Sequence, residues 1–178
     1  KKIWTGRSVR CMEWRNIILR ISVVVTTYNG KMHLEKQLLS LLQQERAPDE
    51  VLIFDDGSTD GTIELVQSFI RKNCLESWQF YVNAKRKGWK QNFMEGLRKA
   101  AGDILFPSDQ DDIWYPKKLA EMTAVMEQHP EIKLLACDYR VLYEPGALKA
   151  TVYKKTPAET QGLITRYGFT KHFFMNPY

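Results

Sequence analysis

The sequence predicts an α/β domain in which a mostly parallel sheet is covered by helices on both faces. Three observations support this prediction. Short β-branched apolar runs alternate with stretches of helical periodicity, as βα units require. Hydrophobic residues make up 44% of the 178-residue chain, which is enough to bury a core. Polar clusters follow the apolar runs, and ligands of such sheets bind beyond the carboxyl ends of the strands.

The first half of the chain predicts two strands, each followed by a helix. Residues 21–27 (ISVVVTT) form a β-branched run, and the helix after YNG is expected to end near residues 43–48 (QQERAP). Its apolar face would consist of Leu34, Leu38, Leu41 and Leu42. Residues 50–56 (EVLIFDD) predict the second strand, and residues 57–62 (GSTDGT) supply good N-cap residues for the second helix. The apolar stripe of that helix would be Ile63, Val66 and Ile70.

The second half of the chain predicts three more strands and two helices. Strands are expected at residues 78–83 (WQFYVN), 103–108 (DILFPS) and 132–138 (IKLLACD). The helix within residues 87–102 would turn Phe93 and Leu97 inward and stop at Gly102. Another helix would start at Pro116, with Leu119, Met122 and Met126 as its apolar face.

The charge and the cysteines limit the class of protein. The net charge is +5, but residues 1–20 hold six Lys or Arg and one Glu, which leaves 20 basic and 20 acidic residues in the body. We therefore expect no nucleic-acid partner. Three well-separated cysteines without a CxxC pair argue against a disulfide framework and favour a reducing compartment. We expect neither a membrane-spanning helix nor a secretory leader.

The basic leader, residues 1–20, has two open interpretations. Its tryptophans and apolar residues beside arginines would allow peripheral contact with an anionic membrane surface. Alternatively, it is a flexible, disordered extension, or it contains vector or upstream sequence before a start at Met12.

Polar residues follow the strands at what should be one rim of the sheet. Candidates for a binding site are Thr27, Tyr28, Asn29, Asp55, Asp56, Asn83, Asp109, Asp111, Asp112 and Asp138. Closely spaced carboxylates repel one another, and a hard divalent cation such as Mg²⁺ or Mn²⁺ would relieve that repulsion and recruit a diphosphate. Neither a P-loop motif nor a GxGxxG motif after the first strand is present, which disfavours a P-loop NTPase and a dinucleotide-binding protein.

Structural explanations compete with the binding interpretation. A tight turn with a helix cap would account for Gly57, Ser58 and Asp60, but poorly for Asp55 and Asp56. The segment DQDD at residues 109–112 would otherwise be a solvated loop. Trp114 and Tyr115 are expected to pack in the core or at the helix entry rather than stack on a substrate.

Four motifs together resemble the family 2 inverting glycosyltransferases of the GT-A (Rossmann-like) fold. They are SVVVTTYNG, DDGSTDGT, KGWKQNFMEGLRKAAGDILFPSDQDDIW and PKKL, in the family's order and spacing. The DQDDIW segment is similar to that of bacterial rhamnosyltransferase-like enzymes of surface polysaccharide assembly. The resemblance covers roughly residues 20–140. It implies a nucleotide-sugar-binding domain at residues 21–140, followed by the start of an acceptor-binding region at residues 141–178.

The resemblance also implies roles for individual residues. Thr27, Tyr28, Asn29 and Asn83 would line the donor site, Asp55 would accept a hydrogen bond from a uracil or thymine imide, and Asp56 would support that pocket. Lys90, expected in the loop before the third helix, would lie near the nucleotide. Asp109 and Asp111 would form the DxD motif, with Asp109 near the sugar or metal and Asp111 on the metal. Asp111 and Asp112 would be catalytic, Asp112 by sharing the metal or by orienting the loop.

The implied reaction transfers a sugar from a UDP- or dTDP-sugar, with inversion, to a glycan or polyprenyl-linked acceptor, in the cytoplasm or at the inner membrane face. Its general base would belong to the acceptor-binding half, and we expect the sequence to be truncated before that residue. Two alternatives stay open. One is a non-catalytic nucleotide-binding fragment. The other is a metal-dependent phosphohydrolase, which usually carries its acidic pair after the first strand and not after the fourth.

Overall fold

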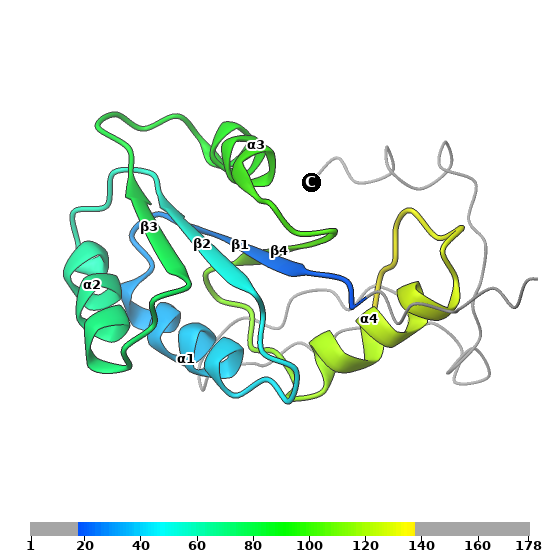
Figure 1. Ribbon diagram of the computed structural model, residues 1–178. Coiled ribbons are helices and arrows are strands. Elements are labelled where there is room, and N and C mark those ends of the chain that lie inside the picture. The colour runs from blue at the N-terminus through cyan, green and yellow to red at the C-terminus, as the bar shows by residue number, and fades with distance from the viewer. Residues whose placement is uncertain (1–17, 138–178) are drawn as a thin grey trace, which may run out of the picture. The chain divides into compact units, whose positions relative to one another are not determined.

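The computed structural model describes residues 18–137, and the predicted order of the first eight elements is confirmed there. The strands are β1 (Ile21–Thr27), β2 (Glu50–Asp55), β3 (Trp78–Val82) and β4 (Ile104–Asp109). The helices are α1 (Lys31–Leu42), α2 (Thr62–Lys72), α3 (Trp89–Lys99) and α4 (Lys118–Gln128). The chain divides into two compact units, residues 1–135 and 136–178, and all eight elements belong to the first (Figure 1).

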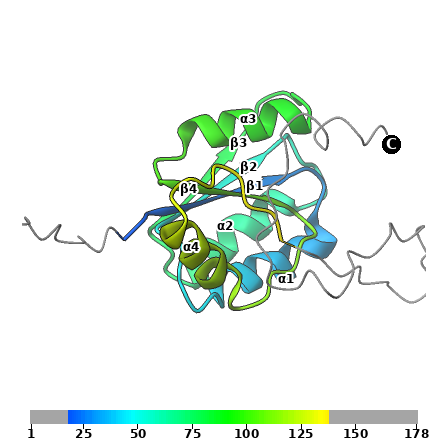
Figure 2. The ribbon, with the colours of Figure 1, turned by 90° about the vertical axis from the view of Figure 1, so that its right-hand side faces the viewer.

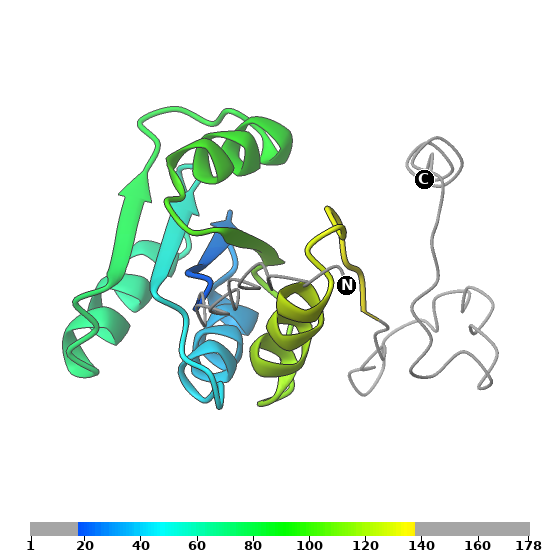
Figure 3. The same ribbon diagram turned by 45° about the vertical axis from the view of Figure 1, so that its right-hand side comes forward.

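The four strands form one parallel sheet in the order β3-β2-β1-β4 (Figure 3). In this register Thr27 pairs with Asp55, and Thr26 pairs with Asp109. The carboxyl ends of β1, β2 and β4 therefore meet at one rim, as the sequence predicted. Within residues 18–137 β4 is an edge strand, which suits Pro107, because proline has no N–H to donate to a further strand.

The helices cover both faces of the sheet, which confirms the predicted fold class. α1, α2 and α4 lie on one face and α3 lies on the other (Figure 2). Every residue of β1 is buried, because alternate side chains point into two different helical layers. Val23 and Val25 belong to the larger apolar cluster with the leucines of α1, whereas Val24 contacts the smaller cluster beneath α3. That smaller cluster includes Phe93 and Leu97, which point inward as predicted.

The predicted fifth strand is wrong within the described residues. Residues 132–137 have no regular secondary structure, and Leu134 is 64% exposed. Their apolar composition gives a strand propensity, but a strand also needs a neighbouring backbone with which to pair. The Ile132 N–H donates to the His129 carbonyl, which makes a local turn. Asp138, the last residue of that prediction, lies outside the described residues.

Three predicted element boundaries also change. α4 begins at Lys118, because Pro116 lies in a preceding turn in which the Lys118 N–H donates to the Tyr115 carbonyl. α2 begins after Gly61, whose φ is 91° and which has no side chain to cap the helix; the Asp60 carboxylate instead accepts from the Thr62 N–H at 3.0 Å. α3 ends at Lys99, three residues before Gly102. A Cβ at Gly102 would lie 2.5 Å from Ser22 Oγ, so this glycine permits close packing on β1 and does not stop the helix.

None of the helices within residues 18–137 is long and apolar enough to cross a membrane. Cys74 and Cys137 are free cysteines, whereas Cys11 and most of the basic leader lie outside the described residues.

Candidate functional site

Two acidic groups lie at the carboxyl rim of the sheet. We call Asp55 and Asp56 the acidic pair and residues 109–112 the acidic loop. Paired residues of parallel strands point to the same face, so the side chain of Asp55 follows Thr27 toward the α1 face. Asp109 follows Thr26, which lies on the opposite, α3 face. The two groups share a rim as predicted, but the side chains of Asp55 and Asp109 leave their strands toward opposite faces of the sheet.

Asp55 is fully buried and builds the turn that follows β2. One carboxylate oxygen accepts hydrogen bonds from the main-chain N–H groups of Gly57 (3.0 Å) and Ser58 (2.7 Å). The other accepts from the Ser58 hydroxyl and, at 3.5 Å, from the Thr27 hydroxyl. Gly57 has a φ of 84°, which only glycine adopts without strain. The expectation that a tight turn would explain Asp55 poorly is therefore wrong, because its carboxylate makes the turn.

Asp56 is 3% exposed and holds the β3–α3 loop, residues 83–88. Its carboxylate accepts from the main-chain N–H groups of Lys87 (2.7 Å) and Gly88 (2.8 Å) and from the Asn83 amide (3.1 Å). Burial by itself raises the pKa of Asp56, but the Lys87, Gly88 and Asn83 hydrogen bonds and the charge of Arg86 outweigh it. The pKa of Asp56 is therefore lowered, and the carboxylate stays ionised.

The β3–α3 loop places a cation on Tyr28, which the sequence did not predict. The Arg86 guanidinium lies 4.0 Å from the centroid of the Tyr28 ring. Arg86 stands within the run Lys85-Arg86-Lys87, and no spacing singles it out. Lys90 was expected in this loop, and that prediction is wrong. It is the second residue of α3, where its ammonium lies 5.4 Å from the centroid of the exposed Trp89 ring.

The β1–α1 loop, residues 28–30, is fixed against the β2–α2 loop. Asn29 has a φ of 49°, a conformation that Asn tolerates better than most residues. Its N–H donates to the Ser58 hydroxyl (2.8 Å), and its side-chain oxygen accepts from the Thr59 N–H (2.9 Å). The Gly30 N–H donates to the Thr62 hydroxyl (3.0 Å). Thr27 is 3% exposed beneath this loop, so Tyr28 and Asn29 are the more accessible candidates.

The acidic loop is more open, because Asp109, Asp111 and Asp112 are exposed residues, although the carboxyl group of Asp109 is partly buried. Partial burial raises the pKa of Asp109, and the neighbouring charges of Asp112 and Asp111 raise it further. Asp112 accepts a 3.3 Å hydrogen bond from the Asp109 N–H, so it orients the loop. Within residues 18–137 no three metal-ligating side chains form a ready-made cluster. The oxygen donors of the loop nevertheless suit Mg²⁺ or Mn²⁺, since Mg²⁺ is usually held by one or two carboxylates together with substrate phosphates.

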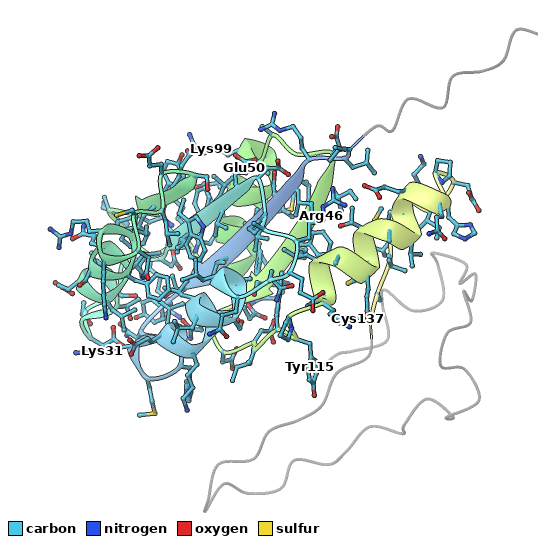
Figure 4. The ribbon with its side chains drawn as sticks, turned by 60° about the horizontal axis from the view of Figure 1, so that its bottom comes forward. Lys31, Arg46, Glu50, Lys99, Tyr115 and Cys137 are labelled. Carbon is cyan, nitrogen blue, oxygen red and sulfur yellow. The ribbon has the colours of Figure 1, made fainter. Side chains whose placement is uncertain are left out.

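Buried side chains anchor the base of the acidic loop. Gln37 of α1 is fully buried, and its side-chain amide donates to the Ser108 hydroxyl. The Ser40 hydroxyl accepts from the main-chain N–H of Trp114 at 3.0 Å. Trp114 is 5% exposed and packs against Phe106, as the sequence predicted. Tyr115 is 67% exposed and projects outward, so the same prediction is wrong for this residue (Figure 4).

A family model decides the classification. The model for glycosyl transferase family 2 matches residues 22–166, which is most of the chain. The chain belongs to glycosyl transferase family 2. This confirms the family inferred from the four motifs, while the rhamnosyltransferase-like subgroup stays a prediction.

Curated relatives give the same classification. The chain is 25% identical over 138 residues to the putative glycosyltransferase EpsE of Bacillus subtilis, covering 78% of this chain and 49% of that protein. It is 30% identical over 155 residues to the poly(ribitol-phosphate) beta-N-acetylglucosaminyltransferase TarS of Staphylococcus aureus, covering 86% of this chain and 26% of that one. The chain thus spans about half, or less, of the length of these relatives.

Solved structures agree with the fold. TarS residues 1–349 in complex with UDP-GlcNAc superpose with a TM-score of 0.57 at 28% identity, covering 63% of this chain and 32% of that one. The mannosyltransferase PcManGT from Pyrobaculum calidifontis, in complex with GDP-Man and Mn²⁺, superposes with a TM-score of 0.57 at 28% identity, covering 61% of this chain and 32% of that one. The chain therefore has the α/β fold of GT-A glycosyltransferases.

Proposed function

We propose that this chain carries the donor site of a glycosyltransferase that uses a UDP- or dTDP-sugar and inverts the anomeric configuration. The acceptor is a glycan or a polyprenyl-linked saccharide of the bacterial cell surface, and the reaction takes place in the cytoplasm or at the inner face of the membrane. One observation carries the proposal: a family 2 chain has three exposed aspartates at the end of β4, on the rim where a parallel sheet binds ligands. The UDP-GlcNAc complex of TarS supports the choice of donor class.

We assign the metal site to the acidic loop. Asp109 and Asp111 would hold Mg²⁺ or Mn²⁺, and Asp112 would keep the loop in position through its bond to the Asp109 N–H. When bound, the cation would neutralise charge on the departing nucleoside diphosphate. Protein carboxylates that repel one another favour such a cation, and the pKa of Asp109 is raised by partial burial and by the charges of Asp112 and Asp111.

The remaining donor-site residues fall into two groups. Tyr28, with Arg86 above its ring, is our candidate for contact with the nucleotide, and Lys90 would act from the first turn of α3. Asp55, Asp56 and Asn83 would contribute by shaping the loops, because their side chains already hold main-chain N–H groups or one another. For Asp55 this replaces a direct bond to the base, since its two oxygens accept four hydrogen bonds inside the protein.

Thermal unfolding tests this proposal. UDP or dTDP should raise the melting temperature of the chain only when Mn²⁺ or Mg²⁺ is present, and Asp111→Asn should abolish that increase. The matched control is Glu76→Gln, which removes an exposed carboxylate just before β3, at the opposite end of the strands. Equal stabilisation by UDP without metal would contradict the metal site, and stronger stabilisation by GDP would contradict the donor class.

Two further assays separate the alternatives. Incubation with radiolabelled donor sugars and a panel of lipid-linked acceptors distinguishes a transferase from a non-catalytic nucleotide-binding fragment. Release of phosphate from a generic phosphate ester would revive the phosphohydrolase, which the position of the acidic loop after β4 disfavours.

A further inference from the structure

Gln110, the neutral residue within the acidic loop, connects this loop to the loop after β1. Its side-chain oxygen accepts a 2.9 Å hydrogen bond from the main-chain N–H of Tyr28, across 82 positions of sequence. Gln110 is partly buried, whereas its neighbours Asp109 and Asp111 are exposed. The glutamine therefore points toward the protein while the carboxylates on either side stay available to a ligand.

The glycine at position 30 leaves the space that Gln110 occupies. A Cβ added to Gly30 would lie 2.2 Å from the Gln110 side-chain oxygen and 2.6 Å from its Cδ. The backbone of Gly30 does not itself require glycine, because its φ is −103° and its ψ is 10°, which any residue adopts. The close approach of the Gln110 side chain thus explains this glycine, and the two residues form one packed contact.

This contact opposes the tendency of the acidic loop to open. The charges of Asp111 and Asp112 act against that of Asp109, and a 3.3 Å hydrogen bond from the Asp109 N–H to the Asp112 carboxylate holds the loop from within. The Gln110 amide has no charge and adds nothing to the repulsion. Its bond to the Tyr28 N–H joins the loop at its middle to a segment that the Ser58 and Thr62 hydroxyls already hold.

We propose that Gln110 is a positioning residue that fixes the acidic loop against the β1–α1 loop, so that Asp109 and Asp111 bind the metal of a metal–nucleotide complex in one geometry. The inference rests on the function proposed above and adds to it a coupling between the loop that holds the metal and the loop that carries Tyr28. A loop released from this contact would have to be ordered during binding, which lowers the affinity for the metal.

A double-mutant cycle tests the coupling. Gln110→Ala removes the acceptor, and Gly30→Ala displaces the same side chain without altering Gln110. The midpoint is the Mn²⁺ concentration that gives half of the UDP-dependent thermal stabilisation. Each variant should raise this midpoint by about tenfold, which corresponds to the upper end of the free energy that one hydrogen bond contributes. The double variant should match either single variant, because the contact can be lost only once. Met32→Ala, at a 77% exposed position of α1, serves as the control and should not change the midpoint.

Two isosteric variants separate the hydrogen bond from the packing. Gln110→Met keeps the length of the side chain without the acceptor and should behave like Gln110→Ala. Gln110→Glu keeps an acceptor for the Tyr28 N–H but adds a fourth carboxylate to the loop, so it should keep the slow exchange of that N–H whatever it does to the Mn²⁺ midpoint. A purely structural role would lower the melting temperature of ligand-free Gln110→Met and leave its Mn²⁺ midpoint unchanged, which would overturn the proposal.

Amide hydrogen exchange gives a readout that does not depend on the ligand. The Tyr28 N–H should exchange faster in Gln110→Ala and in Gly30→Ala than in the wild type or in Met32→Ala. If the wild type shows no metal-dependent response to UDP, the proposed function fails, and the positioning role fails with it. If the wild type responds but the single variants keep its midpoint, or their effects multiply in the double variant, only the positioning role of Gln110 is wrong.

Discussion

The acidic pair after β2 and the acidic loop after β4 have similar sequences and opposite surroundings. Asp55 and Asp56 are buried, and seven hydrogen bonds from loops 57–58 and 83–88 and from Thr27 end on their oxygens. Asp109, Asp111 and Asp112 of the acidic loop are exposed residues. The pKa of Asp56 is lowered by the donors around it, while the pKa of Asp109 is raised by partial burial and by its acidic neighbours.

This difference teaches that a carboxylate after a parallel strand has two distinct uses. Where main-chain N–H groups converge on it, as on Asp55, it orders the loops that surround a site. Where the neighbouring charges are those of other carboxylates, as at Asp109, it is available for a cation. The acidic pair should therefore matter for folding, and the carboxylates of the acidic loop should matter for binding.

The largest effect on stability is expected for Asp55→Ala. The substitution leaves the N–H groups of Gly57 and Ser58 and two hydroxyls without their acceptor, which should cost about 3 kcal/mol or more of unfolding free energy. Asp111→Ala, the matched change in the acidic loop, should shift stability by less than about 0.5 kcal/mol. Urea unfolding of both variants measures the contrast, and equal losses would remove the distinction between the two groups.

An intermediate effect is expected for Asp56→Asn. The Lys87 and Gly88 N–H groups donate to different carboxylate oxygens, and the amide nitrogen that replaces one oxygen in Asn cannot accept. One N–H therefore loses its acceptor, so about 2 kcal/mol of stability should be lost at pH 7. Because the folded pKa of Asp56 is lowered, its contribution is complete above the ordinary value of 3.8 and disappears as the pH falls through the folded pKa. The wild type and the variant should converge in acid; a constant difference down to pH 2 would mean that the charge of Asp56 is not responsible.

The smallest effect, and one of opposite sign, is expected for Asp109→Asn. Since the folded pKa of Asp109 is raised, its ionised form costs stability at neutral pH, and the cost vanishes below the ordinary value of 3.8. The variant should be more stable than the wild type by up to about 0.5 kcal/mol at pH 7 and indistinguishable from it near pH 3. Destabilisation at pH 7 would show that the Asp109 carboxylate has a structural partner.

The sequence was sufficient where local pattern and tertiary context agree. The β-branched run at residues 21–27 and the leucine stripe of α1 predict elements that the sheet and its apolar cluster then bury. It was insufficient where a long-range partner decides. Residues 132–137 have the composition of a strand but no pairing, and Tyr115 carries no signal that separates it from the buried Trp114.

The candidate site shows the same division. The carboxylates of the acidic loop were found because charge density at a strand end is visible in sequence. The use of Asp55 as a turn acceptor, the stacking of Arg86 on Tyr28 and the contact between Gln110 and Gly30 join residues that only the folded chain brings together. No spacing rule connects positions 30 and 110.

The pairing of Thr26 with Asp109, and not with Ser108, has a consequence for how such a site tolerates change. Strand side chains alternate with a period of two. A slip of one residue between β1 and β4 would therefore turn Asp109 toward the α1 face and Ser108 toward the α3 face. An insertion or deletion inside β4 would thus remove a carboxylate from the rim without altering any residue of the loop. The number of residues in β4 is therefore constrained as strongly as the packing of their side chains, because it sets the face toward which Asp109 points.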